Sequence, residues 1–185
     1  MLTVGHVAWC GVDPLYVTYH DEEWGRTPAT ERELFELLTL EGMQAGLSWL
    51  TILRKREGFR DGFHRFEPSA VAAMSSVDVE ALLQNPGIVR HRGKIEATIG
   101  NAAALLTLYD AGQSLSLVCE RYRPPARPRK RPDVDEFVSS TPESEALSKQ
   151  LRAYGFRFVG PTIVYAFFQA AGFVDDHLEG CCVEA

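Results

Sequence analysis

The sequence lacks the features that mark a membrane or an exported protein. No apolar run approaches the roughly 18 residues that a transmembrane helix needs, and the N-terminal residues lack the basic and apolar regions of a signal peptide. We therefore expect no membrane segment and, by default, a cytoplasmic location. The hydrophobic and charged fractions of 45% and 24% are those of an ordinary globular protein. We expect a monomer with a single domain over residues 1–185.

Net positive charge is also missing, since the formal net charge is -6. Such a charge usually argues against a nucleic-acid partner, because phosphate binding depends on Lys and Arg. The charges are nonetheless separated along the chain: residues 121–131 are rich in Arg, whereas acidic residues gather between positions 21 and 36. Prolines between positions 124 and 132 prevent regular structure in the basic stretch. This stretch is either a solvated loop or a contact with DNA.

No segment alternates apolar and polar residues with period two for long enough to form a sheet, which predicts an all-α fold. Thr30 and Glu33 have the spacing of a capping box, and the leucines that follow recur at helical spacing, so we predict a helix that ends near Gly42. A long amphipathic helix from about His91 to Gly112 is indicated by apolar residues that step by four and three, at Ile95, Ile99, Ala102, Leu106 and Tyr109. Further helices are predicted from about Ser48 to a basic C-terminal turn at Arg54, Lys55 and Arg56, after Pro68, after Ser76, and up to Arg121.

Two helices joined by a short connection are predicted in the last third of the chain. Thr141 and Pro142 open the first and Gly155 closes it, while a second begins at Pro161 and ends at Gly172. The start of the second helix, with Gly160 and Thr162, offers free backbone N–H groups that can bind a phosphate. This pattern is typical of a helix-hairpin-helix motif, although many α-hairpins also have a glycine in the turn.

Few residues are available as metal ligands, and they gather at the two ends of the chain. The candidates are Cys10, His20, His177, Cys181 and Cys182. Two thiolates and two imidazoles would satisfy the tetrahedral preference of zinc and leave no open position, as in structural sites. The alternative is that these side chains are small buried hydrophobes and core histidines. Cys119 lies among apolar residues of a predicted helix and is expected in the core.

A carboxylate occupies a position where the helical pattern requires an apolar side chain. The next step of the stripe Leu34, Leu37 and Leu38 is Glu41. Burial of an unpaired carboxylate costs several kcal/mol, so we expect Glu41 to be paired, protonated or facing a polar cavity. The segment 16–25 is likewise rich in polar and aromatic residues suited to recognition, although core packing explains its aromatics equally well.

These motifs together resemble the type I family of 3-methyladenine DNA glycosylases, in the helix-hairpin-helix superfamily. The resemblance spans nearly the whole chain, and several long motifs in the same order are far more specific than any one of them. The motifs that carry it are 13–16 (DPLY), 19–25 (YHDEEWG), 40–49 (LEGMQAGLSW), 87–94 (GIVRHRGK), 158–160 (FVG), 176–177 (DH) and 180–182 (GCC).

The resemblance implies a fold, a cofactor and a set of site residues. The implied fold is that of a helix-hairpin-helix DNA glycosylase, with the motif at about 143–172 and one structural Zn²⁺ that joins segments 10–20 and 177–181. The implied residues are the zinc ligands Cys10, His20, His177 and Cys181, the methyladenine pocket Tyr19, Glu41 and Trp49, and the lesion-contacting Gly46 and Leu47.

The resemblance further implies that the protein hydrolyses the N-glycosidic bond of 3-methyladenine in double-stranded alkylated DNA, which releases the base and leaves an abasic site. The nucleotide must first be extruded from the duplex. Trp49 would then stack on the base, and Tyr19 and Glu41 would form hydrogen bonds with it. Because N3-methylated adenine is cationic and already a good leaving group, binding beside a carboxylate carries much of the discrimination. Glu41 would also favour an oxocarbenium-like transition state, by analogy with glycoside hydrolysis.

Strand cleavage coupled to base excision requires an amine nucleophile. No lysine follows the penultimate predicted helix, so we predict a monofunctional hydrolase. Asp175 is an alternative candidate for activating the attacking water. Two rival functions stay open at this point: a non-catalytic DNA-damage-binding protein with the same hairpin and zinc site, and a glycosylase with a different base preference.

Overall fold

The computed structural model describes residues 11–129, 138–181 and 183, and every regular element within these ranges is helical. This confirms the all-α prediction. No helix in these ranges is both long and apolar enough to span a membrane. The elements are α1 (Pro14–Glu22), α2 (Glu31–Gln44), α3 (Trp49–Gly62), a 3-10 turn η2 (His64–Phe66), α4 (Pro68–Ala72), α5 (Ser76–Gln84), α6 (Arg92–Asp110), α7 (Leu115–Glu120), α8 (Pro142–Ala153) and α9 (Pro161–Ala170).

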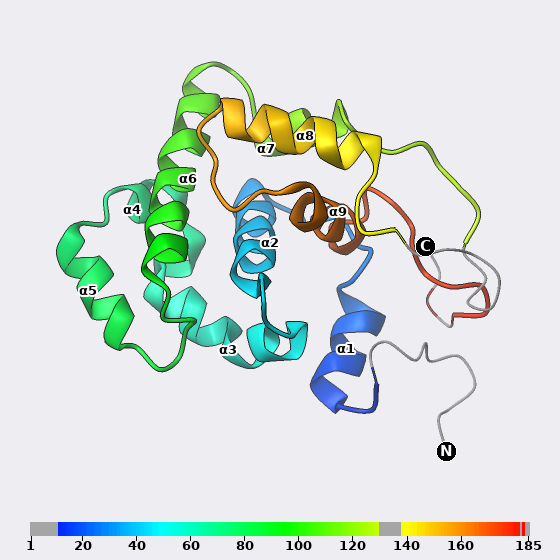
Figure 1. Cartoon of the computed structure of the whole chain (residues 1–185), viewed down its shortest axis with the longest axis horizontal. Helices are drawn as coiled ribbons and strands as arrows, with labels where there is room; N and C mark the ends of the chain where they lie inside the picture. The colour runs from blue at the N-terminus through cyan, green and yellow to red at the C-terminus, as the bar shows by residue number, and fades with distance from the viewer. Residues whose placement is uncertain (1–10, 130–137, 182, 184–185) are drawn as a thin grey trace.

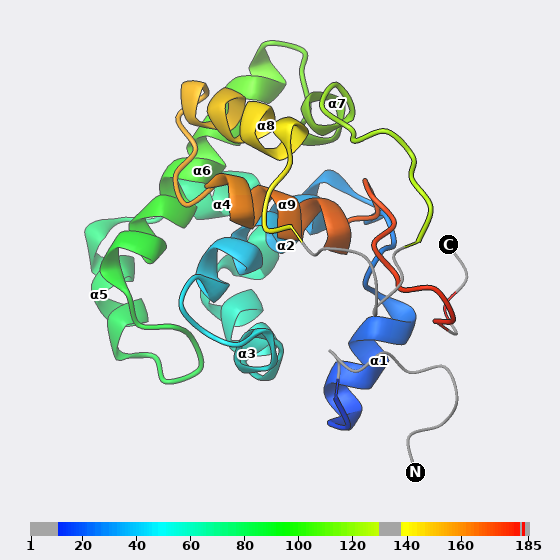
Figure 2. The ribbon, with the colours of Figure 1, turned by 45° about the vertical axis from the view of Figure 1, so that its right-hand side comes forward.

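Helix α2 lies in the middle of the molecule and is surrounded by the other helices (Figure 1). It packs against α9, α3 and α6, while α8 covers α9 from the other side and α4 packs on α6. Helix α1 lies at the edge, next to the C-terminal segment that follows α9 (Figure 2). The two distant ends of the described chain therefore meet beside α2 and α9.

Helix starts follow local capping chemistry. The Thr30 side chain accepts a hydrogen bond from the Glu33 N–H, and the Glu33 carboxylate accepts one from the Thr30 N–H, which completes the predicted capping box. The predicted starts at Pro142 and Pro161 are also confirmed. Helix α1 was not predicted, although Asp13 caps it and Pro14 occupies its first position.

The predicted end of α3 at its basic turn is wrong, because the helix continues to Gly62. Arg56 donates two hydrogen bonds to Glu23, at 2.5 and 2.9 Å, and Arg60 donates one to Glu36 at 2.7 Å. These side chains join α3 to neighbouring segments rather than compensating the dipole of a helix end. Basic residues in the middle of a helix look the same in sequence as basic residues at its terminus.

The buried face of α6 matches the predicted one only in part. Ile95 and Ala102 are fully buried, as expected. Ile99 and Tyr109, which belong to the predicted apolar stripe, are only partly buried. Lys94, Thr98 and Asn101 are buried instead, with 6%, 2% and 6% of their surface exposed. The predicted stripe left these positions out because they are polar.

The described part of the basic segment after Tyr122 lacks regular structure, as predicted, but Arg127 and Arg129 bond to the C-terminal part of the chain instead of being only solvated. Arg127 donates a hydrogen bond to Asp176 at 2.5 Å and another to the Tyr165 hydroxyl, and Arg129 lies 3.0 Å from Asp175. Arg131 lies outside the described residues. As predicted, Cys119 is fully buried in the core.

Candidate functional site

A cavity of about 300 Å³ lies between α1, the end of α2, the start of α3, α9 and the C-terminal segment. The three residues expected to form a base pocket, Tyr19, Glu41 and Trp49, all line it. Its other lining residues are Tyr16, Trp24, Gln44, Ala166, Gln169, Asp176 and Leu178.

The aromatic wall of the cavity is built from two helices. Tyr19 belongs to the last turns of α1, and Trp49 is the first residue of α3, directly after the N-cap Ser48. Their ring centroids are 5.4 Å apart, with an interplanar angle of 51°. Both residues are more than nine-tenths buried. The Trp49 Nε1–H is buried and finds no hydrogen-bond acceptor in the described part of the chain. These rings provide flat apolar surfaces on which a planar ligand can pack.

Glu41 brings a carboxyl group into this apolar wall. It is 4% exposed, and burial alone raises its pKa from 4.5 to about 8. No described side chain forms a hydrogen bond or an ion pair with it. Burial and then nearness to Glu41 also raise the pKa of Tyr19 well above its ordinary value, so its hydroxyl stays protonated. A cation that entered the cavity would favour the ionised form of Glu41.

The C-terminal segment supplies polar groups that the sequence did not reveal. Asp176 accepts hydrogen bonds from the Tyr165 hydroxyl at 2.5 Å, from Gln169 Nε2 at 2.7 Å and from Arg127. Burial opposes ionisation of Asp176, but the hydrogen bonds from Tyr165, Gln169 and Arg127 hold its pKa below the ordinary value. Asp176 is therefore an anchored carboxylate in the cavity wall. Helix α9 has an apolar sequence, which offers no local signal that Gln169 faces a cavity.

Asp175, the alternative candidate for activating water, has both carboxylate oxygens engaged. Oδ1 accepts from the backbone N–H of His177 at 3.0 Å and lies 2.7 Å from His177 Nδ1, while Oδ2 lies 3.0 Å from Arg129 Nε. These bonds favour a structural role, and Asp175 is absent from the cavity lining.

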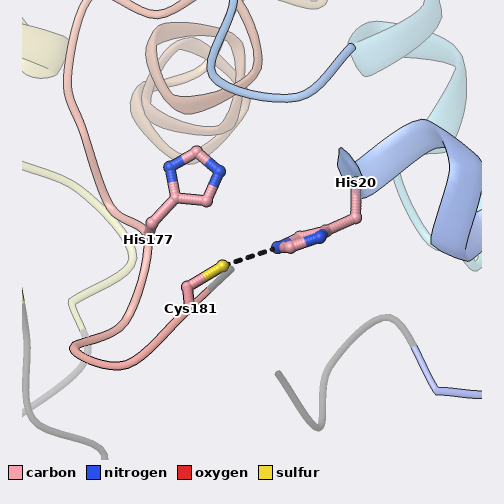
Figure 3. A group of neighbouring side chains, drawn as sticks. All are labelled: His20, His177 and Cys181. Atoms are coloured by element: carbon pink, nitrogen blue, oxygen red, sulfur yellow. Dashed lines mark hydrogen bonds between the residues drawn. The ribbon is translucent and has the colours of Figure 1, made fainter. Parts of the chain in front are cut away.

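Three predicted metal ligands come together beside this cavity. His20, His177 and Cys181 each offer a ligand atom, and these atoms lie within 4.8 Å of one another. Figure 3 shows the two imidazoles and the thiol converging from α1 and from the C-terminal segment, with Cys181 Sγ 3.5 Å from His20 Nε2. The other two candidates, Cys10 and Cys182, lie outside the described residues.

The chemistry of this cluster fits a zinc ion. His20 Nδ1 lies 2.7 Å from an Asp21 carboxylate oxygen, and Asp175 is at the same distance from His177 Nδ1. Such carboxylate partners orient metal-bound imidazoles through Nδ1, so that Nε2 is the nitrogen that faces the metal. His177 Nε2 is buried without a hydrogen-bond partner among the described residues. Two imidazole nitrogens and a thiolate are preferred zinc donors.

Trp24 joins the cavity to this cluster. It lines the cavity, and its ring lies edge-on to the His177 ring with centroids 4.6 Å apart. It also stacks on His20, with centroids 6.1 Å apart. Trp24 lies in the segment 16–25, which was predicted to suit recognition, but no role was predicted for Trp24 itself. Its position four residues after the candidate metal ligand His20 was the sequence signal that could have indicated this role.

The residues expected to contact DNA lie in two turns that are close to each other. Gly46 has φ +81°, and the next residue, Leu47, is 43% exposed. In the connection between α8 and α9, Phe158 has φ +55° and is 37% exposed. A Cβ added at Gly42 would lie 3.1 Å from the Phe158 carbonyl oxygen, so the end of α2 touches this connection. Gly160 caps α9 without a side-chain hydrogen bond, and Thr162 is exposed.

Over the described residues, the fold and the site define an all-helical protein with an aromatic pocket, a buried carboxyl group and a His/Cys cluster that fits a metal ion. The sequence model described as methyladenine glycosylase matches residues 9–184. The chain therefore belongs to the methyladenine glycosylase family.

Named relatives cover almost the same length. DNA-3-methyladenine glycosylase 1 of Escherichia coli K12 is 49% identical over 175 residues, which are 94% of each chain. A crystal structure of a 3-methyladenine DNA glycosylase I superposes with a TM-score of 0.91 at 49% identity, covering 96% of this chain and 98% of that one. Another glycosylase I, a tyrosine-to-phenylalanine variant in complex with 3-methyladenine, superposes with a TM-score of 0.86 at 38% identity over 92% of each chain.

Proposed function

We propose that this protein excises 3-methyladenine from alkylated double-stranded DNA by hydrolysing the N-glycosidic bond. The reaction releases the free base and leaves an abasic site. The observation that carries the proposal is the uncompensated carboxyl group of Glu41 in a cavity walled by Tyr19 and Trp49. Membership of the family supports it, since the relatives described above are named as 3-methyladenine DNA glycosylases.

Recognition follows from the charge of the base. An extruded 3-methyladenine stacks on Trp49, and Tyr19 and Glu41 hydrogen-bond to its edge. Glu41 is about half ionised only near pH 8 in the empty pocket, but the cationic ring lowers this pKa and gains a charge-assisted contact. Neutral adenine offers no such gain, so the pocket discriminates by charge. Ionised Glu41 also stabilises the positive charge that develops on the sugar as the bond breaks.

Contacts with DNA are assigned to the two neighbouring turns. Leu47, carried on the turn at Gly46, is an exposed apolar side chain suited to insertion between bases at the lesion. Gly160 and Thr162 present the start of α9, where free backbone N–H groups can bind a phosphate. We assign the second turn to a helix-hairpin-helix motif at about 143–172, and we propose a single domain that acts as a monomer.

A structural zinc ion is part of the proposal. His20, His177 and Cys181 would hold it, with Cys10 as the fourth ligand. A bound zinc ion with four protein ligands supplies a cross-link between the N- and C-terminal segments and has no open position for water or substrate. The chemistry then takes place around Glu41. We propose a hydrolase without strand-cleaving activity, since that activity requires an amine nucleophile at the site.

The direct test is release of free 3-methyladenine from methylated duplex DNA, measured by chromatography. Wild-type protein is expected to release the base and to leave abasic sites without strand breaks, and Glu41→Gln is expected to be at least about 100-fold slower. Folded, zinc-loaded protein that binds the damaged duplex but releases no base would instead support a non-catalytic damage-binding protein. Faster release of another methylated base would indicate a glycosylase with a different preference.

A further inference from the structure

We propose that one polar face of α6 sets the spacing between the two DNA-contacting turns, with Lys94 and Asn101 as positioning residues. This inference rests on the proposed function, since it concerns how the same site meets the duplex. It gives a role to Lys94, the last residue of the 87–94 motif, and to a buried polar stripe that the proposed reaction does not use.

Lys94 holds the end of α2. Its ammonium group donates hydrogen bonds to the carbonyl oxygens of Met43 and Ala45, each at 2.8 Å. No carboxylate is paired with it in the described structure, and only 6% of the residue is exposed. Burial of an ammonium without a counter-ion is costly unless its protons are satisfied. The C-terminal carbonyls of α2 satisfy them and carry the negative end of the helix dipole.

These carbonyl groups lie directly before the turn that is proposed to contact DNA. Helix α2 ends at Gln44, and Gly46 and Leu47 follow directly. Lys94 therefore fixes the exit direction of the backbone one residue before the turn that carries Leu47. An apolar residue at position 94 would leave two carbonyls at the helix end unsatisfied and free this turn to move.

Asn101 holds the second turn in the same way. Its side-chain Nδ2 donates to the Arg157 carbonyl at 3.0 Å, and its Oδ1 accepts from the Arg157 N–H at 2.8 Å. The amide thus pairs with both backbone polar groups of one residue. Phe158, with φ +55°, comes next, so Asn101 fixes the backbone at the start of the tightest part of the connection.

Both anchors belong to one rigid element. Asn101 follows Lys94 by two helical turns on the same face, about 10 Å along the axis, and Thr98 lies between them with its hydroxyl bonded to the Lys94 carbonyl at 3.0 Å. In Figure 1 the connection between α8 and α9 runs beside α6 before it reaches the start of α9. Helix α6 therefore acts as a ruler: it holds the turn at Gly46 and Leu47 at a fixed distance from the connection between α8 and α9.

The test compares excision from duplex DNA with binding of the free base. Lys94→Met and Asn101→Leu are each expected to slow single-turnover excision roughly 10- to 100-fold, the range that a displacement of about 1 Å produces. Affinity for free 3-methyladenine, measured by tryptophan fluorescence, is expected to stay within about twofold of wild type, since the pocket residues are unchanged. Lys55→Met is the matched control, because it also removes a lysine-to-carbonyl bond, to Pro86 at 2.6 Å, and should keep excision within about twofold.

The Lys94→Met/Asn101→Leu double variant distinguishes a shared role in spacing the two turns from two independent effects on stability. If both residues set one spacing, loss of either removes it, and the double variant is expected to be about as slow as the slower single variant. Rate losses that multiply, or free-base affinity that falls in parallel with excision, would overturn the inference. If Lys94→Met does not fold, Asn101→Leu decides alone: slower excision with unchanged base affinity supports the ruler, and any other combination refutes it. Absence of excision by wild-type protein would instead refute the proposed function.

Discussion

Glu41 shows how one buried group links fold and function. It occupies a position on the packed face of α2 that normally takes an apolar side chain, and its carboxyl group has no partner among the described residues. The protein therefore gives up some stability to keep an ionisable group next to the aromatic walls of the pocket. This cost has a measurable dependence on pH.

Glu41→Gln is expected to stabilise the protein increasingly as pH rises. The pKa of Glu41 is about 8 in the folded state and near 4.5 in the unfolded state. Between these values the folded state holds the extra proton, so rising pH destabilises the wild type but not the variant. The difference in unfolding free energy should grow by on the order of 3 kcal/mol from pH 5 to 7.5.

Urea denaturation of both proteins across this pH range measures the difference. Because the two proteins share every other titratable group, those contributions cancel. A difference that stays constant with pH would show that Glu41 has an ordinary pKa in the folded protein.

At the scale of elements, the basic segment 121–129 holds the C-terminal segment through Arg123, Arg127 and Arg129. Arg127 bonds to Asp176 and Tyr165, and Arg129 bonds to Asp175. Asp176 lines the pocket, and Asp175 lies 2.7 Å from the imidazole of His177, a proposed zinc ligand. The loop therefore contributes to the site indirectly, through the residues it holds.

Arg127→Met is expected to lower the free energy of unfolding by about 1–3 kcal/mol, because Asp176 stays buried and loses a charged partner. The salt dependence of DNA binding should keep its slope, since this arginine already has an internal partner. Arg32→Met, at an exposed arginine of α2, serves as the control and should change stability by less than about 0.5 kcal/mol. A shallower salt slope for the Arg127 variant would indicate a phosphate contact.

A close backbone approach connects the end of α9 to the segment after α1. Gly172 has φ +69°, and a Cβ there would lie 2.5 Å from the Gly25 carbonyl oxygen. Gly112 has a similar φ of +67°, but a Cβ added there would have no atom within 4 Å. Gly112→Ala should therefore cost about 1–2 kcal/mol from backbone strain alone, while Gly172→Ala should cost at least about 2 kcal/mol more. Thermal denaturation of both variants measures the two losses of stability. Equal losses would mean that the backbone around position 172 moves easily to admit the added methyl group.

At the scale of the whole molecule, the proposed zinc ion joins segments that are far apart in sequence. His20 belongs to α1, whereas His177 and Cys181 follow α9. A cross-link across so long a loop restricts the unfolded chain, which is worth on the order of 4–5 kcal/mol in a chain-entropy model. The same cluster contacts Trp24, so it also supports one wall of the pocket.

Chelation of the metal is expected to lower the melting temperature of the wild type by roughly 10 °C or more, which corresponds to several kcal/mol for a chain of this size. His20→Ala should melt at the temperature of the chelated wild type and should not respond to chelator. Elemental analysis should find about one zinc ion per wild-type chain. A wild type that contains no zinc and melts unchanged with chelator would refute the structural zinc site.

What the sequence by itself determined are the features that depend on neighbouring residues. Helix starts at Thr30, Thr141 and Pro161 follow from local capping, and the unusual position of Glu41 follows from helical periodicity. Residue type already pointed to His20, His177 and Cys181 as candidate metal ligands, whereas the resemblance assigned Tyr19 and Trp49 to a pocket with Glu41, because long motifs carry information that single spacings lack. Tyr19, Glu41 and Trp49 then proved to line one cavity.

Tertiary structure decided the features that depend on partners distant in the chain. Arg56 lies mid-helix because Glu23 receives its hydrogen bonds, and Lys94 and Asn101 are buried because backbone groups of other segments satisfy them. Local sequence cannot show this, since a polar side chain is buried only where distant atoms complete its hydrogen bonds. The polar groups around the pocket and the ruler face of α6 therefore became visible only once the helices were packed together.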